Sequence, residues 1–216
     1  FKPIVHTFGP FASRRCYDQV FLSGGYAGNS ITVIGTDPGV TATFNGGTHM
    51  PFEDIALYRA IPNAIIVDIT DVSMLKDFLR QAKDLPGIKY LRVGRKGSAK
   101  VYSEDSHFQI GKGIVLREGK DAAIIACGIM VHEAMQAAEI LSQDGIEVAV
   151  IDIFTIKPLD VELVKTYARK TGTIVTAENH NKIGGLYSAV KDALDGEAKT
   201  GYVAVEDEFG EVGPQD

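Results

Sequence analysis

Short apolar runs alternate with amphipathic segments along almost the whole chain, and this alternation constrains the fold more than any other feature. Apolar runs of strand length cover residues 3–8, 30–35, 63–69, 88–94, 122–128, 147–153, 173–178 and 201–205. Helical patterns stand between most of them, at residues 11–25, 72–85, 131–145, 160–172 and 186–196. Strands that alternate with helices imply parallel sheets with helices on both faces. We therefore predict an α/β fold of two doubly wound domains with mainly parallel sheets, joined by a linker.

The expected linker covers residues 95–121. This stretch is rich in charged residues, serine and glycine, and only residues 113–116 have the pattern of a strand. Residues 1–94 and 122–216 are therefore expected to form one domain each.

Composition limits the classes of function. The 216 residues are 45% hydrophobic and carry a net charge of −6 with interspersed signs. That balance offers no basic stripe for nucleic acid, and no apolar run reaches the roughly 18 residues of a membrane span. We expect a cytoplasmic protein with neither nucleic-acid nor membrane partners. Cys16 and Cys127 are expected to be buried thiols, with a disulfide or a metal ligand as the less common alternatives.

Several polar residues have an expected structural role. Asp71 and Asp160 precede helical patterns, where an N-cap aspartate accepts hydrogen bonds from the first free backbone N–H groups. Glu178 and His180 follow the strand at 173–178, at the edge of a sheet where α/β sites form. We interpret them as members of a hydrogen-bonded loop and not as catalytic groups.

One histidine stands out by its context. His49 lies in the stretch TFNGGTHMPFED at residues 43–54, behind Gly46 and Gly47, in an expected loop between a strand and a helix. Glycines let a backbone pass close to a ligand, and an imidazole can donate or accept a proton near neutral pH. From the residues alone, a loop histidine in solvent remains the alternative.

Five segments together resemble the transketolase family of thiamine diphosphate enzymes. They are VHTFGPFASRRCYDQV (5–20), GGTHMPFEDIALYRAIPN (46–63), YLRVGRKG (90–97), IDIFTIKPLD (151–160) and ENHNKIGGLYSAV (178–190). The resemblance implies that residues 1–94 are part of a pyrimidine-binding domain and residues 122–216 a transketolase C-terminal domain. This arrangement is that of the C-terminal subunit of a split transketolase.

The resemblance also implies roles for particular residues. Phe11 matches the aromatic residue that stacks on the aminopyrimidine ring of the cofactor, and Phe8 beside it and Arg14 close by are expected to bind the cofactor with it. The alternative is that both phenylalanines are core residues. His49 matches the histidine that hydrogen-bonds the substrate where charge develops and protons move. It is the expected catalytic residue.

Two further positions are expected to contact substrate. Asn45 stands where many transketolases carry an aspartate that reads a substrate hydroxyl, so the identity of the sugar is open. Arg95 matches an anion-binding arginine at the mouth of related sites, where its guanidinium suits phosphate or sulfonate. An ordinary surface arginine is the alternative for Arg95.

Two parts of the family's machinery are absent from the sequence. The family's catalytic glutamate normally lies upstream of the first strand, so we expect a truncated chain, an omitted N-terminal region or a non-catalytic copy. No segment resembles the module that binds the diphosphate and Mg²⁺. The resemblance therefore implies a partner, an N-terminal transketolase subunit that holds most of the Mg²⁺ site, and self-association through the C-terminal domain.

Three functions remain open on the sequence. The first is a thiamine-diphosphate-dependent transketolase subunit that moves a two-carbon ketol unit from an anionic ketose to an aldehyde. The second is another thiamine enzyme, either a 2-oxoacid dehydrogenase E1 β subunit or a deoxyxylulose phosphate synthase-like protein. The third is a non-catalytic assembly subunit.

Overall fold

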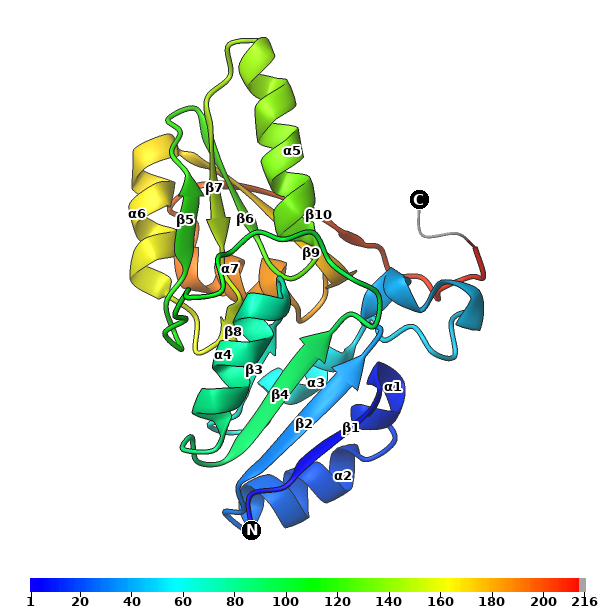
Figure 1. The fold of residues 1–216 in the computed structure, drawn as a ribbon. Coiled ribbons are helices and arrows are strands. Elements are labelled where there is room, and N and C mark those ends of the chain that lie inside the picture. The colour runs from blue at the N-terminus through cyan, green and yellow to red at the C-terminus, as the bar shows by residue number, and fades with distance from the viewer. Residues whose placement is uncertain (214–216) are drawn as a thin grey trace.

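The structure, a computed structural model, describes residues 1–213 and consists of two five-stranded sheets covered by helices (Figure 1). The first sheet has the order β1-β2-β4-β3-β8, and the second has the order β10-β9-β6-β7-β5. All pairs are parallel except β3 with β8 and β7 with β5. The predicted α/β class with two mainly parallel sheets is confirmed.

The first sheet and its helices are built mainly from the first half of the chain. Its strands are β1 (Ile4–Phe8), β2 (Ile31–Thr36), β3 (Ile65–Asp68), β4 (Ile88–Val93) and β8 (Thr155–Lys157). Its helical segments are α1 (Gly9–Ala12), α2 (Tyr17–Gln19), the π-helix η1 (Val20–Tyr26), the 3₁₀ segment η2 (Gly39–Asn45), α3 (Asp54–Arg59) and α4 (Val72–Ala82). Helix α4 covers one face of this sheet, where Phe78 packs with Val67 and Leu91.

The second sheet follows the expected alternation closely. Its strands are β5 (Ile114–Arg117), β6 (Ala122–Ala126), β7 (Val148–Asp152), β9 (Thr173–Asn181) and β10 (Lys199–Val205). The helices are α5 (Met130–Gln143), α6 (Val161–Thr171) and α7 (Leu186–Leu194). Helix α5 packs on one face and α6 and α7 on the other. No helix within residues 1–213 is long and apolar enough to cross a membrane.

Three segments differ from the expected elements. The helix expected at residues 11–25 is interrupted after Ala12, where the backbone of Ser13 leaves the helical region at φ −116° and ψ −95°. The Ser13 hydroxyl donates to the Gly9 carbonyl at 2.7 Å. Residues 155–157, where no strand was expected, form strand β8 on the edge of the first sheet. Strand β9 runs on to Asn181, because that residue pairs with Val205 of β10.

The predicted caps are confirmed, and of the two expected buried thiols Cys127 is buried and Cys16 is half-buried. Asp71 accepts hydrogen bonds from the Ser73 and Met74 amides at the start of α4, and Asp160 accepts one from the Leu163 amide at the start of α6. Cys16 and Cys127 are free thiols, and no group of metal-binding side chains occurs within the described residues.

One hydrophobic cluster joins the two sheets. Ile66 and Tyr90 of the first sheet belong to the same buried cluster as Ile125 and Ile151 of the second. The ring of Tyr58 on α3 stacks on that of Tyr90 with centroids 3.9 Å apart. The interior is therefore continuous from one sheet to the other.

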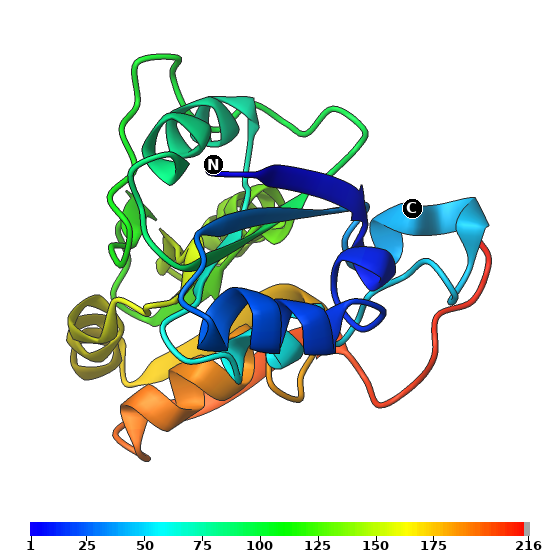
Figure 2. The ribbon, with the colours of Figure 1, turned by 90° about the horizontal axis from the view of Figure 1, so that it is seen from below.

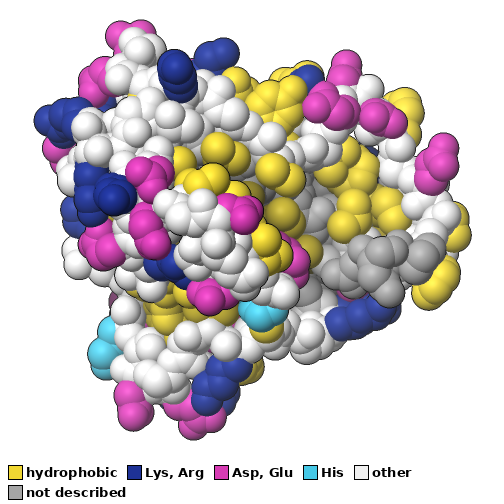
Figure 3. Space-filling model, turned by 90° about the horizontal axis from the view of Figure 1, so that it is seen from above, with side chains coloured by type: hydrophobic (Ala, Val, Ile, Leu, Met, Phe, Trp, Pro, Cys, Tyr) yellow, Lys and Arg dark blue, Asp and Glu magenta, His cyan; other side chains and the backbone are white. Residues whose placement is uncertain are grey.

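The carboxyl ends of β1, β2 and β4 meet the C-terminal tail at one side of the molecule, beside η2 (Figures 1 and 2). Seen from above, hydrophobic side chains gather on the surface where the tail ends (Figure 3). On the tail itself, Phe209 and Val212 are 98% and 68% exposed. Apolar surface therefore lies close to the edge of the first sheet where ligand sites of α/β proteins form.

Candidate functional site

Two phenylalanines and a histidine meet at the carboxyl end of β1. Phe8 ends that strand and Phe11 lies in α1, the short helix that follows. The ring of His49 stands edge-on to both, with centroids 5.1 Å from Phe8 and 5.2 Å from Phe11. All three side chains are half-buried. The structure therefore brings together three of the residues singled out in the sequence.

The polypeptide around His49 is held by short local hydrogen bonds. The His49 amide donates to the Gly46 carbonyl at 2.9 Å, and Gly46 has a φ of 72°, which favours glycine. The Nδ1 atom of His49 lies 2.9 Å from the Thr48 hydroxyl. When that hydroxyl donates to Nδ1, the ring proton is on Nε2, which is then the atom that can meet a substrate.

Arg14 and Arg15 take different positions around this cluster. The Arg14 guanidinium pairs with Glu53 at 2.6 Å and donates to the Thr48 carbonyl at 3.0 Å, so it ties the end of α1 to the His49 loop. The Arg15 guanidinium lies over the Phe11 ring, 3.9 Å from its centroid. Arg15 was not singled out in the sequence, although its i, i+4 spacing from Phe11 is a signal that could have pointed to it.

The side chain of Arg95 reaches the same area from the end of β4. Its guanidinium lies 5.5 Å from the Phe8 ring centroid, and its Nε is 3.4 Å from an oxygen of Asp37. Asp37 is buried and its second oxygen has no hydrogen-bond partner within residues 1–213. Burial raises the pKa of Asp37, while Arg95 acts to lower it.

A cavity of about 350 Å³ opens next to Arg95. It is lined in part by Arg95, Lys96 and Ser98 from the segment after β4, together with Thr41 and Asp71. Two cations and a hydroxyl suit the oxygens of an anion. Asn45, at the exposed end of η2, makes no side-chain hydrogen bond within the described residues and is free to contact a ligand.

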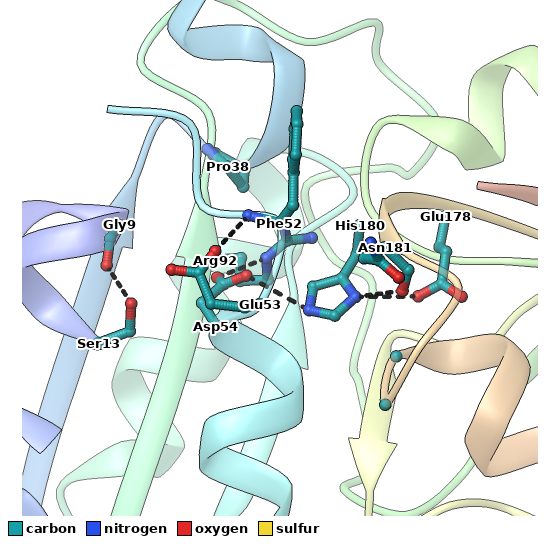
Figure 4. Close-up of polar contacts among 12 residues, drawn as sticks. Gly9, Ser13, Pro38, Phe52, Glu53, Asp54, Arg92, Glu178, His180 and Asn181 are labelled. Carbon is teal, nitrogen blue, oxygen red and sulfur yellow. Dashed lines mark hydrogen bonds and ion pairs between the residues drawn. The ribbon is translucent and has the colours of Figure 1, made fainter. Parts of the chain in front are cut away.

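Glu178 and His180 belong to a separate, fully buried network (Figure 4). Glu178 accepts the amides of Leu186 and Tyr187 at 2.6 and 2.8 Å and so caps α7. His180 lies between Glu178 and Asp54, each with its nearest atoms 3.8 Å away. Both residues are in strand and not in a loop, and neither reaches the aromatic cluster.

Arg92 is the central cation of that network. Its guanidinium pairs with Asp54 and Asp68, both at 2.8 Å, and donates to the Asn179 carbonyl at 2.9 Å. Burial opposes its charge, but the two carboxylates outweigh that effect and raise the Arg92 pKa. Asp68 also accepts from the Cys127 thiol, whose pKa is raised well above its ordinary value by burial and then by Asp68.

The residues present fit one part of the expected cofactor. Half-buried aromatic rings at a strand end suit a flat heteroaromatic ring, although Arg15 covers one face of Phe11, so a ring must use the other face or displace Arg15. A metal is different. Residues 1–213 contain no cluster of three or more side chains that could hold one.

Taken together, the fold and this cluster define a two-sheet α/β protein with a site at the carboxyl ends of parallel strands, where α/β proteins bind ligands. Comparisons with known proteins agree with this class of fold. Residues 1–98 match the family model "Transketolase, pyrimidine binding domain", and residues 111–215 match "Transketolase, C-terminal domain". The chain belongs to the transketolase family, whose members depend on thiamine diphosphate.

Its relatives include subunits of divided transketolases. The chain is 44% identical over 99% of its length to a 6-deoxy-6-sulfo-D-fructose transketolase subunit of Clostridium sp. (strain MSTE9), covering 67% of that protein. It is 36% identical over 89% of its length to an apulose-4-phosphate transketolase subunit of Phocaeicola vulgatus, covering 62%. A solved split-gene transketolase, described as an inactive β₄ tetramer, superposes with a TM-score of 0.90 at 38% identity, over 97% of this chain and 69% of that one.

Proposed function

We propose that this chain is the pyrimidine-side subunit of a transketolase that transfers a two-carbon ketol unit from an anionic ketose to an aldehyde acceptor. The observation that carries the proposal is the cluster of Phe8, Phe11 and His49 at the carboxyl end of β1. The Arg95 guanidinium lies over the Phe8 ring. Thiamine diphosphate, when bound, supplies the carbanion that attacks the ketose carbonyl.

The residues of this chain have separate tasks in the proposal. Phe11 stacks on the aminopyrimidine ring, and Phe8 walls the same space. His49 holds or moves a proton at the substrate oxygen where charge develops, through the nitrogen that Thr48 does not contact. Asn45 hydrogen-bonds a substrate hydroxyl without bringing a charge.

The substrate class follows from the cations beside the cavity. Arg95 and Lys96 line it, so a ketose with a terminal sulfonate or phosphate would place its anion there. The names of the two relatives support this class, since one concerns a sulfonated sugar and the other a sugar phosphate. For the transfer to occur, the sulfonate or phosphate of the ketose must lie far enough from its carbonyl group that His49 can still reach the reacting hydroxyl.

Partner and domain assignments belong to the same proposal. Residues 1–94 would form the pyrimidine side, residues 95–121 the linker and residues 122–216 the C-terminal domain, through which the subunit associates with itself. An N-terminal transketolase subunit would supply most of the Mg²⁺ and diphosphate site. The description of the solved relative as an inactive tetramer of β subunits supports the need for such a partner. The setting would be the cytoplasm.

Ketol transfer by the two-subunit complex tests the proposal. The panel consists of 6-deoxy-6-sulfofructose, fructose 6-phosphate and apulose 4-phosphate, with glyceraldehyde 3-phosphate as acceptor. We expect turnover of at least one ketose, and a loss of about 10²- to 10⁴-fold in kcat for His49→Ala, as for other general acid–base groups. His132→Ala, an exposed histidine on α5, is the matched control and should be unchanged.

Arg95→Ala should raise KM for the ketoses more than it lowers kcat, because an anion contact away from the reacting bonds is made in ground and transition states alike. Consumption of pyruvate instead of any ketose would identify another thiamine enzyme. Binding of the partner without thiamine diphosphate or turnover would leave only an assembly subunit.

Cofactor binding is tested separately by titrating thiamine diphosphate with Mg²⁺ into the complex. Phe11→Ala should weaken binding by about 3- to 10-fold, the effect of losing one aromatic stacking partner. Phe44→Ala is the control, since Phe44 is exposed on η2 outside the aromatic cluster. Arg15→Ala should leave the affinity unchanged or raise it, because it uncovers the second face of Phe11. Equal affinities of the Phe11 and Phe44 variants would place the pyrimidine elsewhere.

A further inference from the structure

The side chain of Asn179, from the second sheet, holds the start of the loop that carries His49. Its Oδ1 accepts from the Val40 amide and its Nδ2 donates to the Pro38 carbonyl, both at 2.9 Å. Asn179 is 5% exposed. Each of its two amide functions is thus used on the backbone of one short segment that lies about 140 residues earlier in the chain.

The same strand end also holds the far end of this loop. The Asn181 amide donates to the Phe52 carbonyl at 3.0 Å. Residues 179–181 of β9 therefore grip the loop 38–52 at both of its ends, with Asn45 and His49 between the two contacts.

Inside the loop, buried Ala42 and Met50 alternate with exposed residues. Asn45 and Thr48 are exposed, and Thr43 adopts φ 35° and ψ −104°, outside the regions that such a residue prefers. A strained backbone of this kind persists only when its surroundings hold it. The hydrogen bonds at the loop's ends are one part of these surroundings that comes from the second domain, and the packing of Ala42 and Met50 near Val205 is another.

Asn179 is itself fixed in place. Its carbonyl accepts from Arg92 at 2.9 Å, and Arg92 is locked by two buried carboxylates of the first domain. Gly39 packs so close to Asn179 that a Cβ on it would lie 2.0 Å from Oδ1. The φ of 57° at this position also favours glycine. Any larger residue at position 39 is therefore disfavoured for two independent reasons.

We propose that Asn179 is a positioning residue for His49, so that the C-terminal domain sets the geometry of the substrate loop. The inference rests on the proposed function only for what His49 does to substrate. Asn179 touches neither the cofactor space nor the cavity beside Arg95, and acts through the backbone at Pro38 and Val40.

Hydrogen exchange tests the grip without any reference to activity. In the complete two-subunit complex, Asn179→Ala should speed exchange of the Val40 amide and of the peptide over 39–49 by at least 10-fold. Amides of β6 should keep their rates. Thr176→Ala is the matched control, because Thr176 is buried in the same strand and its hydroxyl has no hydrogen-bond partner within residues 1–213.

A second pair of variants disturbs the contact between Asn179 and residues 38–40 by changing the loop instead of Asn179. Gly39→Ala should loosen the loop as Asn179→Ala does, by pushing the amide away. Gly28→Ala should not, because Gly28 has a φ of 72° but nothing within 4 Å of its added Cβ. Unchanged exchange at 39–49 in both Asn179→Ala and Gly39→Ala would overturn the proposal.

Kinetics then separate positioning from general loss of folded protein. Asn179→Ala should lower kcat by about 10- to 100-fold, the scale of a misplacement near 1 Å. In a His49→Ala background it should lower kcat by less than 3-fold, because the group it positions is gone. Equal losses in both backgrounds would overturn the link to His49. An inactive wild-type complex would instead contradict the proposed function, and the exchange result would still decide on the grip.

Discussion

His180 is an imidazole in surroundings that strongly favour its neutral form. It is fully buried, its Nδ1 lies 2.6 Å from the Asn181 carbonyl, and its Nε2 has no hydrogen-bond partner within the described residues. Asp54 and Arg92 act on it from the first domain and Glu178 from its own strand. Burial is the largest effect and lowers the His180 pKa to about 4, against a raising contribution from Asp54.

This shift predicts a loss of stability in acid. A histidine in the unfolded chain has a pKa of about 6.5. Between about pH 6.5 and 4 this residue is therefore protonated in the unfolded chain and neutral in the folded one. The contribution of His180 is therefore complete above pH 6.5 and falls as the pH drops towards 4, by about 3 kcal/mol in all. Below pH 4 it is constant.

Urea unfolding from pH 7.5 to 4 measures this contribution as a difference from His180→Gln, whose side chain does not titrate. The two carboxyls whose pKa values burial raises to about 7, Asp152 and Glu178, are shared by both proteins. The free energy of unfolding of the wild type should fall relative to the variant across this range. A difference that does not change with pH would show that His180 titrates normally.

At the scale of elements, one carboxylate joins helix α4 to the segment between β4 and β5. Oδ1 of Asp71 accepts from the first free amides of α4, at 3.0 and 3.1 Å. Its Oδ2 accepts from Val101 at 3.0 Å and from Tyr102 at 2.8 Å. Four backbone donors thus depend on a single side chain that is 2% exposed.

Asp71→Ala should therefore be more harmful than loss of an ordinary cap. We expect it to lower the free energy of unfolding by about 3 kcal/mol, since a cap contributes roughly 1 kcal/mol and stranded buried donors add to that. Asp160→Ala, at the cap of α6, should lower it by about 1 to 2 kcal/mol, because among residues 1–213 Asp160 accepts hydrogen bonds from two amides, those of Leu163 and Gly113, and its ion pair with Lys112 is long, at 3.7 Å. Urea midpoints compare the two; an equal effect would mean that the contacts with the segment between β4 and β5 contribute nothing.

Local signals were enough for most elements and for both of these caps. Helices α4, α5, α6 and α7 begin within a residue of the expected positions. Their apolar periodicity and the aspartates or glycines at their ends are local sequence signals. Strand β8 and the extension of β9 were missed. Both depend on pairing with β3 and β10, which no local pattern encodes.

The same distinction applies to the candidate site. The residues 8, 11 and 49 were singled out by resemblance, but their edge-on contact is a product of the fold. The position of Arg15 over Phe11 agrees with their i, i+4 spacing, a local signal that the sequence analysis did not use. The hydrogen bonds of Asn179 to residues 38–40 have no local signal, since they need the two domains docked.

At the scale of the whole molecule, the two domains share their interior. Strand β8 comes from the second half of the chain but completes the first sheet, and Lys157 on it donates to the carbonyls of Arg59 and Ile61 at 2.8 and 2.7 Å. The largest hydrophobic cluster contains residues of both sheets. We therefore expect the two sheets to lose structure together.

Arg92→Leu tests this cooperativity at two buried ion pairs of the first domain, whose members also contact Asn179 and Cys127 of the second. The change leaves Asp54 and Asp68 buried without their cation and should lower the free energy of unfolding by about 3 to 5 kcal/mol. Arg117→Leu is the matched control, because Arg117 also pairs with two carboxylates but with partners that are largely exposed, and it should change stability by about 1 kcal/mol or less.

Hydrogen exchange should show β4 and β6 losing protection by the same factor in Arg92→Leu, since the Arg92 network reaches β6 through the Asp68–Cys127 contact and β9 through Asn179. Loss of protection in β4 alone would show that the two domains unfold independently and that the shared cluster does not couple them.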